Sequence, residues 1–198
     1  MRRFLASTFA AAALAAGLFA SAGPARSAPP AGTWTGDPVH SFVVFKIRHM
    51  GTSWVYGRFN EPVVSLEAGD EGTGVTSVNF VVGTAKVDTG NEKRDQHLRS
   101  PDFFNAKQFE EISFKSTAAK AVDADTTEVT GDLTLHGVTK PVTVKVMRVG
   151  HGKGLQKEDI AGYEATISLK RSDYGMTNMV GPVGDEVALT IAVEAARK

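Results

Sequence analysis

Residues 84–116, TAKVDTGNEKRDQHLRSPDFFNAKQFEEISFKS, interrupt the pattern that the rest of the chain follows. The stretch begins like a strand and passes into a charged turn of helix over Asn91–Leu98. Two bulky rings follow at Phe103 and Phe104, and the chain returns to a strand at Ile112–Phe114. Most other segments are short and alternate apolar with polar residues, which is typical of strands. The sequence therefore predicts a sheet protein with one helical excursion.

Outward from this stretch, the segment VHSFVVFKIRH, which ends at His49, alternates most clearly. A period of two puts Phe45 and Ile47 on one face and leaves Lys46 and Arg48 in water. The inner face is apolar in its middle and ends at His49, which we interpret as a polar cap on the end of its strand.

Further strand patterns recur at short intervals along the chain. They cover residues 54–59, 62–67, 75–87, 112–122, 128–135, 141–149, 163–170 and 186–194. Gly57 indicates a bend or bulge, and the glycine-rich run 150–154 indicates a hairpin tip. The irregular stretch 177–182 is either a lip over a ligand tunnel or an ordinary loop.

About eight antiparallel strands and one short helix predict an all-β fold, either a closed barrel or a sandwich. The longest strands favour the barrel, because they would project from a compact sandwich unless they wrapped around something. An eight-stranded barrel is just wide enough to hold one elongated ligand.

Residues 1–28 have the pattern of a cleaved signal peptide and leader. A basic pair, Arg2 and Arg3, precedes an apolar run that ends at Ala20 and is short for a membrane span. The cleavage sites that fit lie after Ala22, Ala25 and Ala28. We therefore expect export with cleavage rather than membrane anchoring.

A flexible Pro/Ala/Gly-rich leader is expected over residues 29–33, and one folded domain over residues 34–198. The chain has 22 basic and 22 acidic residues, and the loss of three signal-region arginines leaves 19 against 22. This faintly acidic balance argues against nucleic acid as a partner. The lack of cysteine excludes thiolate nucleophiles, cysteine-ligated zinc and iron–sulfur clusters.

Four motifs occur in order along the domain. They are DPVHS at 37–41 with HMG at 49–51, RDQHLRSPDFF at 94–104, GDLTLHGVTKPV at 131–142, and RSDYGM at 171–176 with VGDEV at 183–187. Together they resemble the YceI-like family of lipocalin-like, polyisoprenoid-binding bacterial proteins. One departure is the run 108–111, QFEE, where the family commonly has a Tyr-Pro pair.

The resemblance implies an extended antiparallel barrel with a small helix, exported to the periplasm. Its tunnel would hold the tail of an isoprenoid or other long-chain lipid, such as a polyprenyl phosphate or a quinone. The family implies no enzymatic activity and no cofactor, so we expect a carrier, store or scavenger.

The aromatic composition bears on such a tunnel, because eleven phenylalanines accompany only two tryptophans and three tyrosines. Rings without a polar group suit a hydrocarbon ligand. Composition alone fits a dry core better, and the resemblance favours the tunnel. The predicted tail contacts are Phe45, Phe59, Phe80, Phe103, Phe104, Phe114, Leu133, Leu135 and Met176, with His49, Arg94 and His97 as polar members of the site.

The run RDQH at 94–97 has three interpretations. As a head-group site, Arg94 offers a planar fork for phosphate or a carbonyl, and His97 offers a second donor. As structure, Asp95 accepts backbone N–H groups or pairs with an arginine and fixes the helix over the barrel mouth. As catalysis, Asp95 and His97 orient a nucleophile. No nucleophile elbow is present, and we favour the structural interpretation.

The histidine spacing does not predict a metal site. His40 and His49 are an odd number of residues apart and would point to opposite faces of one strand, while His136 and His151 lie in predicted turns. Two other functions stay open: an enzyme acting on such a lipid through Asp95 and His97, and a redox or stress partner that presents a quinone to a membrane protein. A homodimer and a transient membrane contact also stay open.

Overall fold

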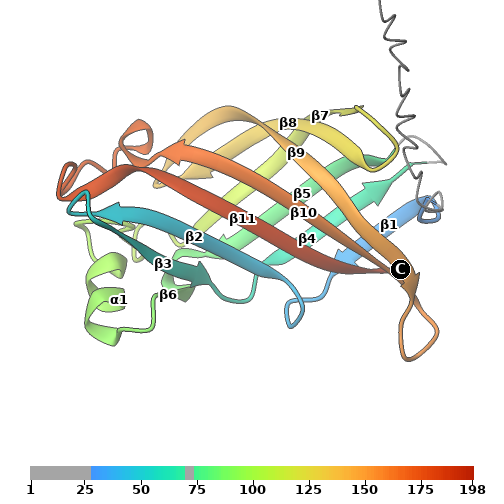
Figure 1. Ribbon diagram of the computed structural model, residues 1–198, viewed down its shortest axis with the longest axis horizontal. Helices are drawn as coiled ribbons and strands as arrows, with labels where there is room; N and C mark the ends of the chain where they lie inside the picture. The colour runs from blue at the N-terminus through green and yellow to red at the C-terminus, as the bar shows by residue number, and fades with distance from the viewer. Residues whose placement is uncertain (1–27, 70–73) are drawn as a thin grey trace, which may run out of the picture.

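The computed structural model describes residues 28–69 and 74–198, so the predicted signal peptide lies, apart from Ala28, outside the described residues. The described residues form one strongly twisted antiparallel barrel (Figure 1). No helix in these two ranges has both the length and the apolar character needed to span a membrane.

The strands follow one another along the chain with one α-helix in the described part. They are β1 (Gly32–Gly36), β2 (Phe42–His49), β3 (Ser53–Phe59), β4 (Val63–Ala68), β5 (Val75–Gly83), β6 (Val87–Asp88), β7 (Glu111–Ala121), β8 (Thr126–Leu135), β9 (Val138–Lys153), β10 (Asp159–Lys170) and β11 (Val183–Arg197), with helix α1 (Glu92–Arg99) and the 3₁₀ turns η1 (Thr84–Lys86) and η2 (Arg171–Tyr174). The ring β1-β4-β5-β7-β8-β9-β10-β11 closes where β1 pairs with β11. The prediction of an eight-stranded all-β barrel with one short helix is confirmed.

The long strand β11 pairs with β1 near one end and with β2 near the other. Gly36 lies opposite Ala195, whereas Phe42 lies opposite Ala192, so residues 37–41 loop out of an otherwise continuous edge. Beyond this loop β2 pairs with β3 instead of β4. Strand β11 therefore has two partners on the same edge: β1 pairs with its C-terminal part and β2 pairs with its N-terminal part.

The predicted strand 75–87 is not continuous, because β5 ends at Gly83 and η1 follows. The hydroxyl of Thr84, a buried residue, donates to the carbonyl of Phe109 at 2.6 Å, and its N–H donates to the carbonyl of Glu110 at 2.8 Å. These bonds close the base of the excursion that carries α1. Asn91 then caps α1 by accepting from the N–H of Arg94 at 3.0 Å, the role expected of Asn at a helix start.

Three smaller predictions are corrected. Gly57 makes no bulge, since β2 and β3 pair in unbroken register across it. Strand β9 runs on to Lys153, so the hairpin tip follows the glycine-rich run instead of coinciding with it. Residues 32 and 33 of the expected leader belong to β1, because their backbone pairs with β4.

The apolar side chains inside the barrel form three groups. One, around the fully buried Trp34, joins β1, β4, β10 and the last part of β11. The other two lie around Phe45 and Phe59, and around Leu133 and Tyr174, close to α1 and η2. The β1 end of the barrel is thus closed by packed side chains, and the interior opens toward the α1 end.

Candidate functional site

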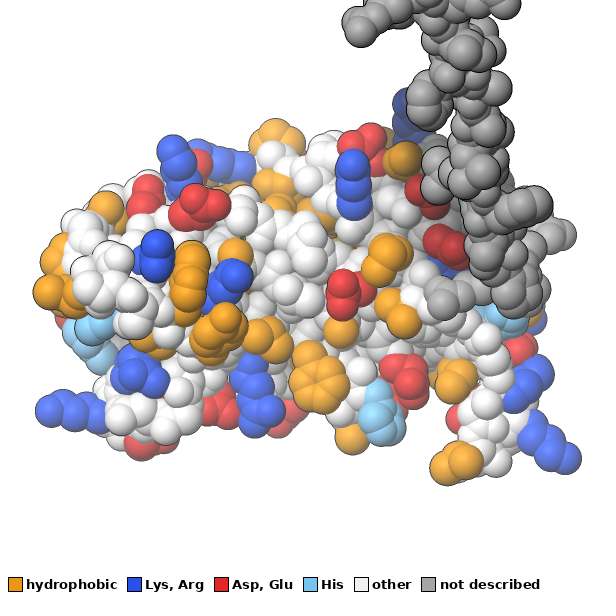
Figure 2. All heavy atoms as spheres, in the orientation of Figure 1, with side chains coloured by type: hydrophobic (Ala, Val, Ile, Leu, Met, Phe, Trp, Pro, Cys, Tyr) orange, Lys and Arg blue, Asp and Glu red, His pale blue; other side chains and the backbone are white. Residues whose placement is uncertain are grey.

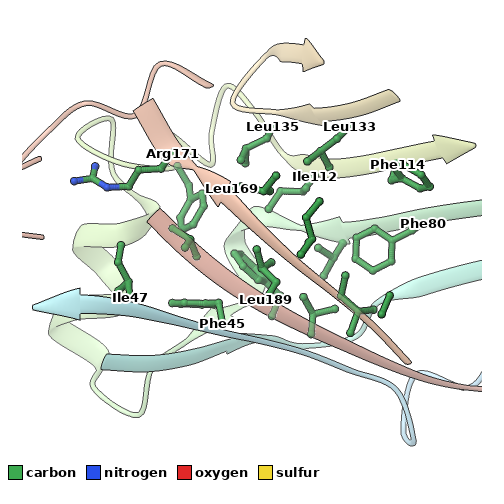
Figure 3. A pocket seen from close by; sticks show the side chains of 18 of the residues that line it. Phe45, Ile47, Phe80, Ile112, Phe114, Leu133, Leu135, Leu169, Arg171 and Leu189 are labelled. Carbon is green, nitrogen blue, oxygen red and sulfur yellow. The ribbon is translucent and has the colours of Figure 1, made fainter. Parts of the chain in front are cut away.

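A cavity of about 400 Å³ lies inside the barrel between these groups. Protein interiors are normally packed with few voids larger than a water molecule. A void of this size falls in the range of small-molecule binding sites. Figure 3 shows its lining side chains converging from strands on opposite walls.

Strands β10 and β11 form one wall of the cavity, because apolar side chains at alternate positions of each strand point inward. On β10, Tyr163, Ala165, Ile167 and Leu169 line the cavity, and on β11 Val187, Leu189, Ile191 and Val193 do so. Ala165 lies opposite Ile191 and Ile167 opposite Leu189 in the β ladder, so these inward side chains form paired rows. Glu164, next to the register shift at Gly162 and Tyr163, also belongs to the lining, whereas the other intervening residues follow the two-residue period of a strand and stay outside it.

All twelve residues of the predicted site line this cavity. They are Phe45, His49, Phe59, Phe80, Arg94, His97, Phe103, Phe104, Phe114, Leu133, Leu135 and Met176. The structure brings them together from eight separate elements and loops, while their contact with a ligand stays a prediction. Sequence reasoning missed the aliphatic rows of β10 and β11, although their alternation is visible in the sequence.

Two glycines make room for rings in the wall. A Cβ atom on Gly57 would lie 2.3 Å from Cζ of Phe45, and one on Gly131 would lie 2.6 Å from Cζ of Phe114. Since real Cβ atoms do not approach so closely, a larger residue at position 57 would displace the ring of Phe45, and one at position 131 would also meet the backbone oxygen of Lys115 at 2.4 Å. Gly57 is therefore required for close packing and not for a bend.

The aromatic side chains nearest α1 form a row in which each ring contacts the next. The ring centroids of Phe45 and Phe59 are 5.6 Å apart, and those of Phe59 and Phe104 are 5.3 Å apart with an edge-to-face geometry. Such spacing is favourable for aromatic pairs. These contacts attach the segment that follows α1 to the barrel wall.

Six of the eight polar lining residues lie at the α1 end, and the other two are Tyr163 and Glu164 on β10. The six are Arg48, His49, Thr89, Arg94, His97 and Arg171, of which Arg48, His49, Arg94 and His97 are exposed. Because exposed residues belong to the lining here, the cavity reaches the surface at this end. The mouth therefore carries basic groups while the interior is apolar.

Asp95 fixes α1 over this mouth. It is buried, and its Oδ1 accepts from the backbone N–H of Thr89 at 3.0 Å. Arg94 donates from Nε to the hydroxyl of Thr89 at 2.7 Å, whereas His97 pairs with Asp102 at 3.0 Å. These contacts agree with the structural interpretation of the run 94–97, because Asp95 and His97 use different partners.

Replacing Asp95 with alanine is expected to lower the free energy of unfolding by about 1–3 kcal/mol, because it leaves the N–H of Thr89 without its acceptor. Urea unfolding would measure this change. The matched control is Asp102→Ala, which removes an exposed ion pair and should change stability by less than about 1 kcal/mol. Equal effects of the two substitutions would show that Asp95 does not hold the helix.

Arg171 organises the loop on the other side of the mouth. Its side chain is buried and donates to the carbonyls of Gly184, Met176 and Asn178, each at 2.8 Å, and to that of Val183 at 3.1 Å. Burial lowers the pKa of its guanidinium below the usual value. The residue thus serves the fold of the 176–184 loop, a role that sequence reasoning did not find.

The closed end of the cavity holds one polar atom without a hydrogen-bond partner among the described residues, the hydroxyl of Tyr163. Burial raises the pKa of this hydroxyl. Buried polar groups nearly always have a partner, so a water molecule or a polar atom of a ligand would be stabilised here.

Comparison with known proteins agrees with this geometry. The pattern of the YceI-like domain matches residues 34–195. The chain belongs to the YceI-like family. It is 40% identical over 194 residues to a UPF0312 protein of Pseudomonas aeruginosa, covering 98% of this chain and 100% of that protein. It is 39% identical over 159 residues to the protein YceI of Escherichia coli O157:H7, covering 80% of this chain and 83% of that one.

Solved structures share the YceI-like barrel. A YceI protein of Campylobacter jejuni aligns with a TM-score of 0.70 at 28% identity, over 76% of this chain and 90% of that one. BcnA of Burkholderia cenocepacia gives 0.71 at 21% identity, over 80% and 98%. A polyisoprenoid binding domain from Saccharophagus degradans gives 0.62 at 16% identity, over 83% and 98%. The last two show similarity of fold alone.

Outside the cavity of this YceI-like chain, a surface group joins the first loop to β11. The Nδ1 atom of His40 lies 2.7 Å from Oδ2 of Asp37 and 3.7 Å from Oε1 of Glu194. These three residues could also hold a metal ion. Sequence reasoning missed the group, because Glu194 is far from the other two along the chain. Its position shows that it fastens the looped-out residues 37–41 to β11.

This group predicts a pH-dependent contact. The hydrogen bond to Asp37, and then its charge, raises the pKa of His40 above 6.5, while the N–H of Val39 and then His40 lower that of Asp37. A raised folded-state pKa means that the contribution of His40 to stability is complete below about 6.5 and is lost as the pH rises through the folded-state value. An NMR titration of the His40 ring should therefore give a midpoint above 6.5 that falls in Asp37→Asn. An unchanged midpoint in that variant would contradict the pairing.

Proposed function

We propose that this YceI-like protein is an exported, non-enzymatic binding protein that holds a long-tailed isoprenoid lipid in its barrel cavity as a carrier, store or scavenger. The observation that carries the proposal is the cavity of about 400 Å³ with an apolar wall and a polar mouth. The Saccharophagus degradans relative in fold, described as a polyisoprenoid binding domain, adds support.

The shape of the lining suits a chain more than a compact ligand. Along the regular part of β11 the lining runs from Val187 to Val193, roughly 20 Å at about 3.3 Å per residue. Burial of hydrocarbon contributes about 0.8 kcal/mol per CH₂, so three isoprene units would supply over about 10 kcal/mol before the cost of binding is subtracted. A long tail can thus bind tightly without polar contacts along its length.

The lipid head would lie at the α1 mouth. Trp34 and its neighbours fill the β1 end, whereas Arg94 and His97 line the exposed end. A polar head left at this mouth stays hydrated, and the tail replaces water in the apolar interior. The opposite orientation would require a head group to be buried against packed side chains.

Export to the periplasm belongs to the same proposal. The predicted signal peptide and leader over residues 1–28 and the binding domain over residues 34–198 would deliver the barrel to a compartment bounded by two membranes. Detection of the processed protein in an osmotic-shock fraction, with its N-terminus after Ala22, Ala25 or Ala28, tests this part. Retention in the cytoplasm would contradict it.

Direct binding of defined lipids tests the ligand class. A long polyprenyl phosphate, a long-tailed ubiquinone and a fatty acid would each be titrated into delipidated protein, with a one-isoprene analogue of each isoprenoid as the control. We expect affinity to rise with tail length and to depend less on the head. Binding that is independent of tail length would contradict a tail-binding cavity, and turnover of a lipid would indicate an enzyme.

A further inference from the structure

Exposed apolar side chains surround the cavity mouth on the side of β2 and β3. Met50 is 60% exposed at the β2–β3 turn, and Met179 and Val180 are 47% and 44% exposed on the facing loop. The N–H of Met50 donates to the carbonyl of Pro182 at 2.7 Å, which joins the two loops. The two loops that carry these apolar tips therefore lie side by side and form a rim.

The two methionines occupy an unusual backbone conformation. Met50 has φ of 52° and Met179 has φ of 53°. This left-handed region favours glycine or asparagine and is uncommon for long side chains. Both methionine side chains are exposed. A glycine or asparagine would adopt this backbone conformation with less strain, so stability of the fold does not explain the two methionines. An observed backbone outlier of this kind suggests a function.

Basic and aromatic side chains continue the rim along the outer face of β2 and β3. Trp54 is 44% exposed, with Nζ of Lys46 5.0 Å and Cζ of Arg48 4.7 Å from its ring centroid. Tyr56 lies opposite Lys46 on the same face and is 57% exposed. Figure 2 shows hydrophobic side chains interspersed with Lys and Arg on the surface over these strands.

We propose that this surface, formed by Lys46, Arg48, Met50, Trp54, Met179 and Val180, docks the mouth of the barrel on an anionic lipid bilayer. Apolar tips enter the interfacial layer, tryptophan and tyrosine lie at the head-group level, and the cations face acidic head groups. Met179 also lines the cavity, so a docked mouth would open directly onto lipid. The purpose of docking, lipid exchange with a membrane, rests on the proposed function.

A bilayer fits this surface better than a second copy of the chain. A symmetric pair would bring Lys46 and Arg48 of both copies into one interface to which the defined surface contributes no acidic residue, and like charges gathered in an interface are unfavourable. A bilayer that contains phosphatidylglycerol supplies the opposite charge over the whole area. The attraction should weaken with salt, because these cations are at the surface.

Tryptophan fluorescence offers a direct test. The chain has two tryptophans, and Trp34 is fully buried, so a change in emission on adding vesicles reports Trp54. The exported, processed protein would be mixed with vesicles of phosphatidylethanolamine and phosphatidylglycerol, and with phosphatidylcholine vesicles, then followed by emission and flotation. We expect a blue shift and co-flotation with the anionic vesicles, reduced by salt.

The matched variants are Met50→Gly with Met179→Gly, and Leu155→Ser. Glycine suits both left-handed positions, so the double variant should fold at least as well as the parent. It should bind vesicles at least about tenfold more weakly, since two buried apolar tips are lost. Leu155 is fully exposed on the β9–β10 hairpin, at the other end of the barrel, and its replacement should leave vesicle binding unchanged.

Absence of a Trp54 shift at millimolar lipid, or equal binding by the double variant, would overturn the docking surface. A dimer in light scattering that the double variant abolishes would also overturn it, in favour of a second copy. Lipid content after solvent extraction separates the two proposals. If the protein carries lipid but does not bind vesicles, docking is refuted and the proposed function stands. If it binds vesicles but takes up no lipid, the proposed function is refuted and docking stands.

Discussion

Replacing Ala165 with phenylalanine should expel lipid from the barrel without unfolding it. Ala165 is a small member of the inward row on β10, opposite Ile191 on β11. A phenyl ring added there would occupy the space of three or more CH₂ groups of a ligand, and at about 0.8 kcal/mol each the loss exceeds about 2 kcal/mol. We expect lipid affinity to fall at least about thirtyfold in a binding titration.

The neighbouring residue gives the matched control. Thr166 is exposed and points away from the cavity, so Thr166→Phe adds the same ring on the outer face of the same strand. This variant should keep the affinity of the parent. Equal losses in the two variants would indicate general damage to β10, and equal retention would mean that the cavity does not hold the ligand.

Replacing Arg171 with methionine should give the largest loss of stability of any variant considered. The substitution keeps an apolar stem but removes the guanidinium donors to the carbonyls of Met176, Asn178, Val183 and Gly184, and Val183 keeps the N–H of Gly181 at 3.2 Å. The loss of four hydrogen bonds from a charged donor, one of them buried and three partly buried, is expected to lower the free energy of unfolding by about 3 kcal/mol or more. Urea unfolding monitored by circular dichroism would measure this change.

Lys170 provides the comparison, because it is exposed and directly precedes Arg171. Lys170→Met should change the free energy of unfolding by less than about 0.5 kcal/mol. A similarly small effect of Arg171→Met would show that the loop on this side of the mouth folds without its central donor.

The fold was predictable because its main signal is local. The alternation around Phe45 and along the other strands follows from burial on one face, and an antiparallel barrel keeps one face inside. The end of β5 at Gly83 was missed, since the bonds from Thr84 to the carbonyls of Phe109 and Glu110 join residues that no local pattern relates. The first strand was missed for a similar reason: Gly32–Gly36 is short and is ordered by pairing with β4 and β11.

The cavity was predictable in part. Phenylalanines could be named from composition and from the family resemblance, and every one that was named lies on the wall. The role of Gly57 depends on where the ring of Phe45 lies across the β ladder, which spacing along one strand cannot show. The groups around Arg171 and around His40 depend on loops that return to β11, so only the folded chain brings their members together.

The most direct test of the central claim is mass spectrometry of the lipid that the native protein carries. Protein would be purified gently from its native source, without detergent, and extracted with organic solvent beside the Ala165→Phe variant and the Thr166→Phe control. We expect one long-tailed isoprenoid species in near-equimolar amount from the parent and from Thr166→Phe, and its loss from Ala165→Phe. Extracts without lipid from all three proteins, each correctly folded, would contradict a lipid-holding barrel.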